Sequence, residues 1–296
     1  MKVFPVGCLL LLLALGRDAG AGAAPIDELI KGAKQEGTIE FYAPSTLTPQ
    51  GAQALSAAFN KKYGIIVKMQ YSPSGNMTRD IGKVVGLGAS GVPPEWDLMV
   101  VTDAHHATLW VKKMHQAFDY KSIGVDAKAI QYDSGSVSFA NQFVLPAYNK
   151  KLVPAKDVPK SWEDLLNPKW KGKLGVSSAT HHMARLAVGA WGEEKTTDFV
   201  KSLTKQDLIL GRLGEIYNRL LLGEIVVAVS LSDSEAKSDK NKTAPVVFAE
   251  AVSPLIAPAY HAGVPKNAAH PQVGHLFAAF LATSEGQKLW DKYAGQ

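Results

Sequence analysis

Short apolar runs alternate with stretches of helical periodicity along most of the chain. In the first half, the runs that predict strands are residues 38–42, 65–71 and 96–101. The stretches whose apolar residues recur every three or four positions, which predict helices, are residues 26–35, 52–63, 77–87 and 107–116. Strands and helices that alternate at these lengths predict an α/β lobe with a doubly wound, mostly parallel sheet.

The same alternation begins again after residue 172. The predicted strands are residues 173–176 and 225–229, and the predicted helices are residues 183–191, 196–203, 215–222, 272–282 and 285–293. Residues 245–259 are extended and interrupted by prolines, so we expect this run to return to the first lobe. The second half therefore predicts a second α/β lobe.

An apolar stretch connects the two sets of elements. Residues 137–153 have little helical period and contain Pro146, which is typical of an extended connector. About 273 residues follow a leader of 23, which exceeds the usual size of one hydrophobic core. We expect a hinge near residues 142–148 and 250–258. The predicted lobes are 24–143 with 251–283, and 144–250 with 284–296.

Residues 1–23 predict a cleaved secretory signal peptide. Lys2 gives the positive start, residues 9–15 the apolar core, and residues 21–23 a cleavage site of small residues. This apolar core is too short to cross a bilayer, so we expect export to the periplasm without a membrane anchor. The only cysteine, Cys8, lies in this leader, so no disulfide or thiol chemistry is expected afterwards.

The charge of the mature chain is weakly positive. Removal of residues 1–23 takes away Lys2, Arg17 and Asp18, which leaves 30 basic and 26 acidic side chains, or +4. Such a small and scattered excess slightly favours acidic small ligands and does not indicate a nucleic-acid partner.

Two stretches carry a family resemblance. Residues 148–176, "YNKKLVPAKDVPKSWEDLLNPKWKGKLGV", and residues 270–290, "HPQVGHLFAAFLATSEGQKLW", resemble the periplasmic solute-binding proteins of ABC importers, of the ferric-ion-binding type. The resemblance implies a two-lobed periplasmic binding protein fold with a cleft and a hinge between the lobes. It also implies a monomer without enzymatic activity that captures a small solute and delivers it to an ABC permease in the inner membrane.

Hydroxyl-bearing and acidic residues follow the predicted strands. In open α/β sheets, ligands bind beyond the carboxyl ends of the strands, where helix N-termini direct N–H groups into the crevice. The candidates in the first lobe are Tyr42, Ser45, Thr46, Ser72, Ser74, Thr102 and Asp103. Those in the second lobe are Ser177, Ser178, Thr180, Ser232, Asp233 and Ser234.

These candidates favour a particular kind of ligand. Hydroxyl and N–H groups on both sides of a cleft suit an oxyanion, but Asp103 and Asp233 would repel a ligand that is only anionic. A zwitterion reconciles the two. The alternative for each residue is an ordinary role as a helix cap.

Two pairs of adjacent histidines stand near strand ends, His105 with His106 and His181 with His182. If the lobes close, His105 and His181 would face the cleft from opposite sides and, with an aspartate, provide a transition-metal site. Adjacent side chains rarely point the same way, so hydrogen bonding to a ligand or a surface role is the alternative. The histidines expected at the surface or at caps are His115, His261, His270 and His275.

The resemblance also indicates where a ferric site would lie. Ferric-binding relatives typically have a histidine after the first strand, a glutamate after the third and a tyrosine pair after the strand that residues 225–229 resemble. This chain has "FYAPST", "MVVTDA" and "VSLSDSEA" at those places, without the tyrosine pair. Because Fe³⁺ favours phenolate and carboxylate oxygens, the usual ferric site is not expected. Transport of iron or another transition metal, a secreted metal-dependent hydrolase and a sensor-type binding protein remain the alternatives.

Overall fold

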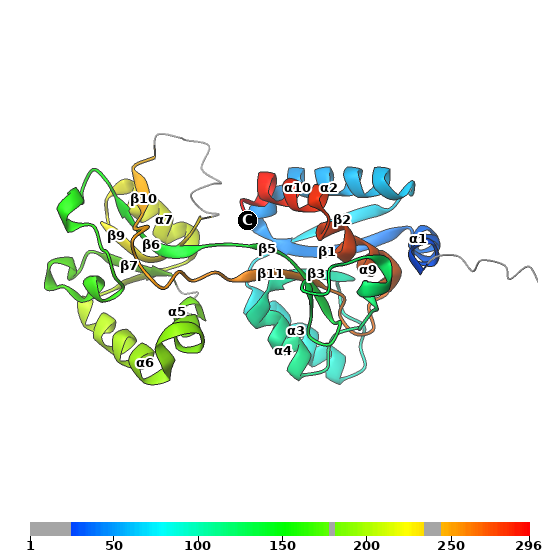
Figure 1. Ribbon diagram of the computed structural model, residues 1–296, viewed down its shortest axis with the longest axis horizontal. Helices are drawn as coiled ribbons and strands as arrows, with labels where there is room; N and C mark the ends of the chain where they lie inside the picture. The colour runs from blue at the N-terminus through cyan, green and yellow to red at the C-terminus, as the bar shows by residue number, and fades with distance from the viewer. Residues whose placement is uncertain (1–24, 178–180, 234–243) are drawn as a thin grey trace, which may run out of the picture.

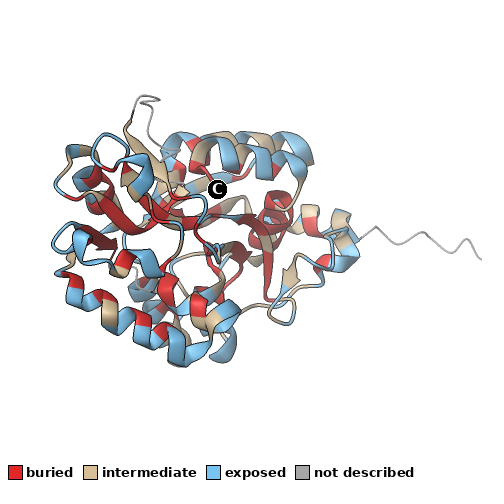
Figure 2. Ribbon diagram, turned by 60° about the vertical axis from the view of Figure 1, so that its left-hand side comes forward, coloured by how far each residue is buried: buried red, intermediate tan, exposed pale blue. Residues whose placement is uncertain are grey.

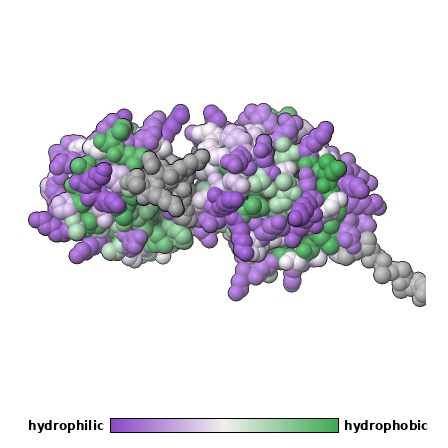
Figure 3. Space-filling model, turned by 90° about the horizontal axis from the view of Figure 1, so that it is seen from above, coloured by the Kyte–Doolittle hydropathy of each residue, from purple (hydrophilic) through white to green (hydrophobic). Residues whose placement is uncertain are grey.

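The computed structural model describes residues 25–177, 181–233 and 244–296, arranged as two lobes, each built around one β-sheet (Figure 1). The predicted leader and three predicted site residues, Ser178, Thr180 and Ser234, lie outside the described residues. Seen from above, the lobes are two separate bodies joined by a narrower waist (Figure 3).

The first lobe contains both ends of the described chain. Its strands are β1 (Thr38–Pro44), β2 (Lys68–Ser74), β3 (Leu98–Thr102), β4 (Ile130–Gln131), β5 (Ser136–Asn141) and β11 (Ala259–Gly263). Its helices are α1 (Pro25–Glu36), α2 (Thr48–Tyr63), α3 (Met77–Ala89), α4 (Asp103–Val111), α9 (Pro271–Leu281) and α10 (Ser284–Ala294). The strand order is β2-β1-β3-β11-β5-β4.

The second lobe is built from the middle of the chain. Its strands are β6 (Val144–Asn149), β7 (Leu174–Ser177), β8 (Ile209–Gly211), β9 (Val227–Ser232) and β10 (Val246–Phe248), in the order β10-β6-β9-β7-β8. Its helices are α5 (His181–Leu186), α6 (Gly192–Leu203) and α7 (Leu213–Leu222), with a π-helical turn at Ala187–Trp191.

The predicted two-lobed α/β architecture is confirmed, but the sheets are mixed rather than mostly parallel. In the first sheet β1 is parallel to β2 and β3, whereas β11, β5 and β4 pair antiparallel. In the second, β7 is parallel to β8 and β9, whereas β6 pairs antiparallel with β9 and β10. The antiparallel pairs in each sheet involve strands next to the crossings between the lobes. No helical crossover connection joins these strands to their neighbours, so their direction need not be parallel.

The chain crosses between the lobes after β5 and again before β11, and the two crossings run side by side (Figure 1). The Gln142 N–H donates to the Pro258 carbonyl at 3.0 Å, and the Val144 N–H donates to the Ile256 carbonyl at 2.8 Å. Two paired segments of extended chain between two bodies make a hinge, because rotation about them leaves both sheets intact.

The prediction that residues 284–296 belong to the second lobe is wrong. Helix α10 packs against α2 and α9 of the first lobe. Trp290 is fully buried there and meets the Phe139 ring on β5 edge-on, with 5.0 Å between centroids. The periodicity of α10 predicts a buried face, but it does not say which body covers that face.

Each lobe has its own apolar core (Figure 2). Helix α9 is buried on nearly all sides because it lies between the first sheet, α1 and α10, which explains its almost continuous apolar sequence. In the second lobe, the short turns at Glu163–Leu166 and Pro168–Trp170 place Trp162 and Trp170 in the core. The stretch that carries the family resemblance is therefore a structural element of the second lobe.

Candidate functional site

The lobes are joined by an ion pair between two strand ends. Asp103 begins α4 directly after β3, and Arg185 lies on α5, which follows β7. The Arg185 guanidinium contacts both carboxylate oxygens of Asp103, with Nη1 donating to Oδ2 at 2.7 Å and Nη2 donating to Oδ1. Figure 1 shows α5 on the side of the second lobe that faces α3 and α4. The carboxyl ends of the two sheets therefore face each other at this pair.

The pair is largely withdrawn from solvent. The side chains of Arg185 and Asp103 are 22% and 28% exposed. Burial alone would raise the pKa of Asp103, but the hydrogen bond and positive charge of Arg185 outweigh it, so the pKa lies below its ordinary value. The Tyr132 hydroxyl donates to the Asp103 backbone carbonyl at 2.7 Å, which fixes the start of α4.

Arg185 retains an unused donor. Its Nε atom is buried and has no hydrogen-bond partner among the described residues. Arg185 was not among the residues predicted from the sequence; it stands four positions beyond His181 on α5. The sequence did contain a signal for Arg185 as a candidate. Only four arginines, against 26 lysines, follow the predicted leader, and Arg185 is one that stands close after a strand end.

The structure brings Tyr42 and Ser74 together in the first lobe. Tyr42 is buried, and its hydroxyl donates to Asp80 Oδ2 at 2.8 Å, while the Ser74 hydroxyl also bonds to the phenol. Burial raises the pKa of Tyr42, with the bond to Asp80 adding to the rise, so the phenol stays protonated. The Arg79 Nε–H donates to Asp80 Oδ1 at 2.9 Å. These side chains join β1, β2 and α3 at one strand edge.

The other first-lobe candidates lie in different surroundings. Ser45 is exposed, Ser72 is half-buried, and Thr46 accepts a long bond from the Gln296 side chain at 3.5 Å. None of the hydrogen bonds described for these three residues reaches the ion pair, so ligand binding by them stays a prediction.

His105 is held by two threonines. Its Nδ1 lies 2.8 Å from the buried Thr102 hydroxyl, and its Nε2 lies 3.2 Å from the Thr78 hydroxyl. Both ring nitrogens therefore bond within the first lobe, and a metal ion could bind only if one bond were broken. The His181 side chain is outside the described part. Across the described residues, no group of three or more His, Cys, Asp or Glu side chains is placed to hold a metal ion.

Two second-lobe candidates bond to the hinge. The Ser232 hydroxyl donates to Gln142 Oε1 at 3.0 Å, and Asp233 Oδ1 accepts from the Phe143 N–H at 2.8 Å. The Asp233 N–H in turn donates to the Phe143 carbonyl at 2.9 Å. Ser177, at the end of β7, is buried. Ser232 and Asp233 thus connect β9 to the first crossing between the lobes.

A stack of histidine rings lies behind the ion pair. His106 Nδ1 is 2.9 Å from His115 Nε2, and His106 Nε2 is 3.0 Å from the His261 carbonyl oxygen. The His106 and Tyr132 rings each lie 5.2 to 6.0 Å, centre to centre, from the rings of His115 and His261, and 6.3 Å from each other. The expectation of a surface role is wrong for His261, because β11 is a central strand and its side chains are covered.

His275 is also buried rather than at the surface. It lies on α9, and its Nδ1 is 2.9 Å from the Tyr120 hydroxyl. His270 precedes α9, as a capping role requires, and its ring and backbone N–H both bond to Asp97.

Lowering the pH from 7 to 5 is expected to destabilise the fold through these histidines. Burial lowers the pKa of both His115 and His261 to about 4, below the 6.5 of an unfolded chain. The unfolded state therefore takes up protons first, and the stabilisation present above pH 6.5 is lost as the pH falls towards 4. Each histidine accounts for about 2 kcal/mol over this interval.

Denaturant unfolding at pH 7 and pH 5 measures this loss. His115→Gln removes one titrating group and is expected to reduce the loss by about 2 kcal/mol. Equal stability of the wild-type protein at the two pH values would show that these imidazoles titrate normally.

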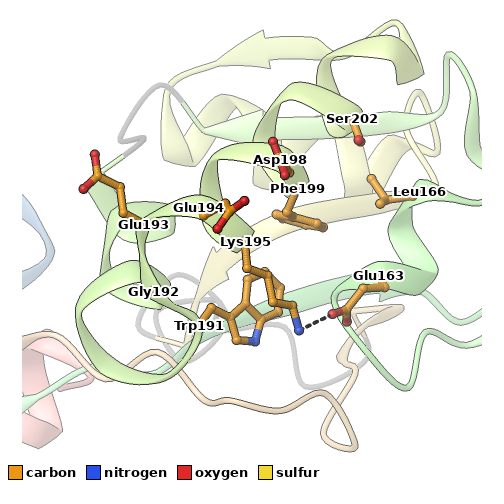
Figure 4. A pocket seen from close by; sticks show the side chains of 10 residues that line it. All are labelled: Glu163, Leu166, Trp191, Gly192, Glu193, Glu194, Lys195, Asp198, Phe199 and Ser202. Carbon is orange, nitrogen blue, oxygen red and sulfur yellow. Dashed lines mark ion pairs between the residues drawn. The ribbon is translucent and has the colours of Figure 1, made fainter.

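A pocket of about 640 Å³ lies elsewhere, on the second lobe (Figure 4). It is formed by α6 and the 163–166 turn, so only one lobe contributes to it. The Lys195 ammonium already lies 2.8 Å from Glu163 Oε1 and 4.3 Å from the centre of the Trp191 ring. Because its central groups bind one another and closure of the lobes would not enclose it, we do not assign the solute to this pocket.

The sequence profile of the bacterial extracellular solute-binding protein family matches residues 39–294. The chain belongs to this family. This confirms the predicted function as a solute-binding protein of the ABC-transport type, and the family description leaves the solute open. None of the helices in the described ranges is long and apolar enough to cross a membrane.

One relative of this solute-binding protein is similar over part of its length. An uncharacterised protein of Haemophilus influenzae is 30% identical over 143 residues, which is 45% of this chain and 40% of that protein. The chain thus spans well under two thirds of that relative.

Two solved structures show the same fold. Iron-bound HitA from Pseudomonas aeruginosa aligns with a TM-score of 0.69 at 19% identity, over 86% of this chain and 83% of that one. The periplasmic binding protein AfuA from Actinobacillus pleuropneumoniae, with fructose-6-phosphate bound, aligns with a TM-score of 0.69 at 19% identity, over 87% and 83%. At these identities the likeness shows the fold alone.

Proposed function

We propose that this solute-binding protein captures an acidic or zwitterionic small molecule between its lobes in the periplasm and delivers it to an ABC permease in the inner membrane. The observation that carries the proposal is the bidentate Asp103–Arg185 pair, which places opposite charges on the two walls of the cleft. A guanidinium fork matches a carboxylate or phosphate in shape and charge. The hinge lets both walls close on one bound molecule.

Closure needs no covalent step. The two crossings between the lobes carry the rotation, and Ser232 and Asp233 attach the first of them to β9. A solute that contacts both walls stabilises the closed form by its differential affinity for that form. The closed form is then the one that docks productively on the permease.

The competing functions lack support from the described residues. A metal-dependent hydrolase needs about three ligands that converge on one ion and leave a position for water. The described residues contain no such group, and His105 bonds to two threonines. A metal-transport role through His105 would require one of these two bonds to break, and the His181 side chain lies outside the described residues.

A defined panel of probes tests the proposal. Inorganic phosphate, sulfate, citrate, glutamate and 4-aminobutanoate are screened by thermal shift, and each one that stabilises the exported protein is then followed by small-angle X-ray scattering. We expect a reduction of the radius of gyration on binding and no turnover of a generic ester and phosphoester panel. Turnover without compaction would favour the hydrolase.

A further inference from the structure

We infer that Asp103 and Arg185 hold the two ends of a zwitterionic solute, which takes the place of their direct contact. This inference rests on the proposed function and narrows its ligand class. The acid group of the solute would bind to Arg185, and its ammonium group would bind to Asp103. The direct pair would separate when the lobes open, and the solute would bridge its two members when the lobes close.

The geometry of the pair supports this assignment. A carboxylate from one lobe already occupies the guanidinium fork of the other, with Nη1 at 2.7 Å from Oδ2. The acid group of a solute would take that same position. The direct pair leaves the buried Nε of Arg185 without a partner in the described part of the chain. An unsatisfied buried donor is unfavourable, so a solute oxyanion that reaches Nε would be a better partner than Asp103.

Asp103 can remain ionised after Arg185 turns to the solute. It is the first residue of α4, and its Oδ1 accepts from the Ala104 N–H at 2.8 Å. A carboxylate in the first turn of a helix is also stabilised by the helix dipole. The neighbouring Tyr132 hydroxyl bonds to the Asp103 backbone carbonyl, so the position of Asp103 does not depend on Arg185 alone.

Charge balance selects a zwitterion over a simple acid or a simple amine. The Asp103–Arg185 pair is neutral as a whole, and both side chains are mostly buried. His261 interacts electrostatically with both members of the pair and is neutral at pH 7, because burial lowers its pKa to about 4. A simple acid would therefore leave one uncompensated negative charge in the closed cleft, and a simple amine one positive charge, each at high desolvation cost. A zwitterion exchanges one ion pair for two and leaves the cleft neutral.

Matched pairs of probes test the inference. The ω-amino acids from glycine to 6-aminohexanoate and the aminoalkyl phosphonate 2-aminoethylphosphonate are compared with the same acids without the amine, by titration calorimetry. We expect at least one zwitterion to bind ten times more tightly than its partner without the amine. The chain length of that probe reports the separation of the two charges in the closed cleft.

Variants separate the two roles. Arg185→Gln is expected to weaken the bound zwitterion at least about 30-fold, because it removes the fork. Asp103→Asn is expected to weaken the zwitterion about tenfold or more and to leave the amine-free acid unchanged or tighter, since a repelling charge is gone. Lys195→Gln removes a charge of the second lobe outside the cleft and should change neither affinity.

The outcomes distinguish the inference from the proposed function. If Asp103→Asn weakened zwitterion and amine-free acid equally, the pair would be a latch of the closed form, and the inference would be overturned. Tight binding of a solute without an amine that survives Arg185→Gln would overturn it too, while leaving the solute-binding function intact. If no panel member binds and a co-purified solute of the wild-type protein is not zwitterionic, the inference likewise fails.

Discussion

Replacement of Asp97 by alanine is expected to lower the free energy of unfolding by about 3–5 kcal/mol. The Asp97 side chain is almost completely buried just before β3. Its carboxylate accepts from the Glu40 N–H at 2.9 Å and from the His270 N–H at 2.8 Å. The ring of His270 lies 2.9 Å from the same group. Alanine would leave these donors of β1 and of the segment before α9 unsatisfied, each at a cost of about 1–3 kcal/mol.

Denaturant unfolding monitored by tryptophan fluorescence measures this effect. Asp119→Ala is the matched control, because Asp119 is exposed and only caps a short turn through the Ser122 N–H. That change should cost about 1 kcal/mol. Similar losses in the two variants would show that Asp97 does not join β1 to the start of α9.

Replacement of Trp290 by alanine is expected to cost about 3–5 kcal/mol. The indole is fully buried between α10 and the first sheet, and it packs against Phe139 on β5. Its Nε1–H donates to Gln296 Oε1 at 3.2 Å. The cavity would form in the first lobe, and the strands that line it are far from Trp290 in the sequence.

Hydrogen exchange tests where this cavity acts. In Trp290→Ala the amides of β5 and β11 should lose protection, whereas those of β7 and β9 in the second lobe should keep it. Leu289→Ala, next to it and only partly buried, serves as the control and should cost less. Lost protection confined to the second lobe would instead support the lobe division expected from the sequence.

Local patterns determine most of the elements, so these could be predicted. The expected strand at 38–42 corresponds to β1, and the expected helices at 272–282 and 285–293 correspond to α9 and α10 within two residues. The helix expected at 107–116 was placed too late. Helix α4 begins at Asp103 and ends before Lys113, whose φ of 55° is unusual for a residue other than glycine, so no sequence signal marked that end.

Pairings between distant segments could not be predicted in the same way. Strand β11 enters the first sheet between β3 and β5, although about 120 residues separate it from β5. Its neighbours depend on where the second crossing returns, and no local period encodes that. The position of α10 on the first lobe has the same cause.

The sequence indicated which candidate residues follow strands, but not which residues they contact. Asp103 lies directly after β3, as its place in the sequence predicted, and the structure pairs it with Arg185 of the second lobe, but a role in ligand binding stays a prediction. Thr102 bonds to His105, three residues later in the chain, whereas Asp233 bonds to the first crossing, a partner that is close only in space. A residue type at a strand end indicates what it can bind, but the fold decides which partner reaches it.

Native mass spectrometry of the protein purified from the exported fraction without chelator tests the central claim most directly. We expect a mass excess of one to a few hundred daltons that is lost on denaturation, identifies an acidic or zwitterionic solute, and disappears in Arg185→Gln. An excess that matches a single metal ion, or an organic solute retained equally by Arg185→Gln, would contradict a solute site at the Asp103–Arg185 pair.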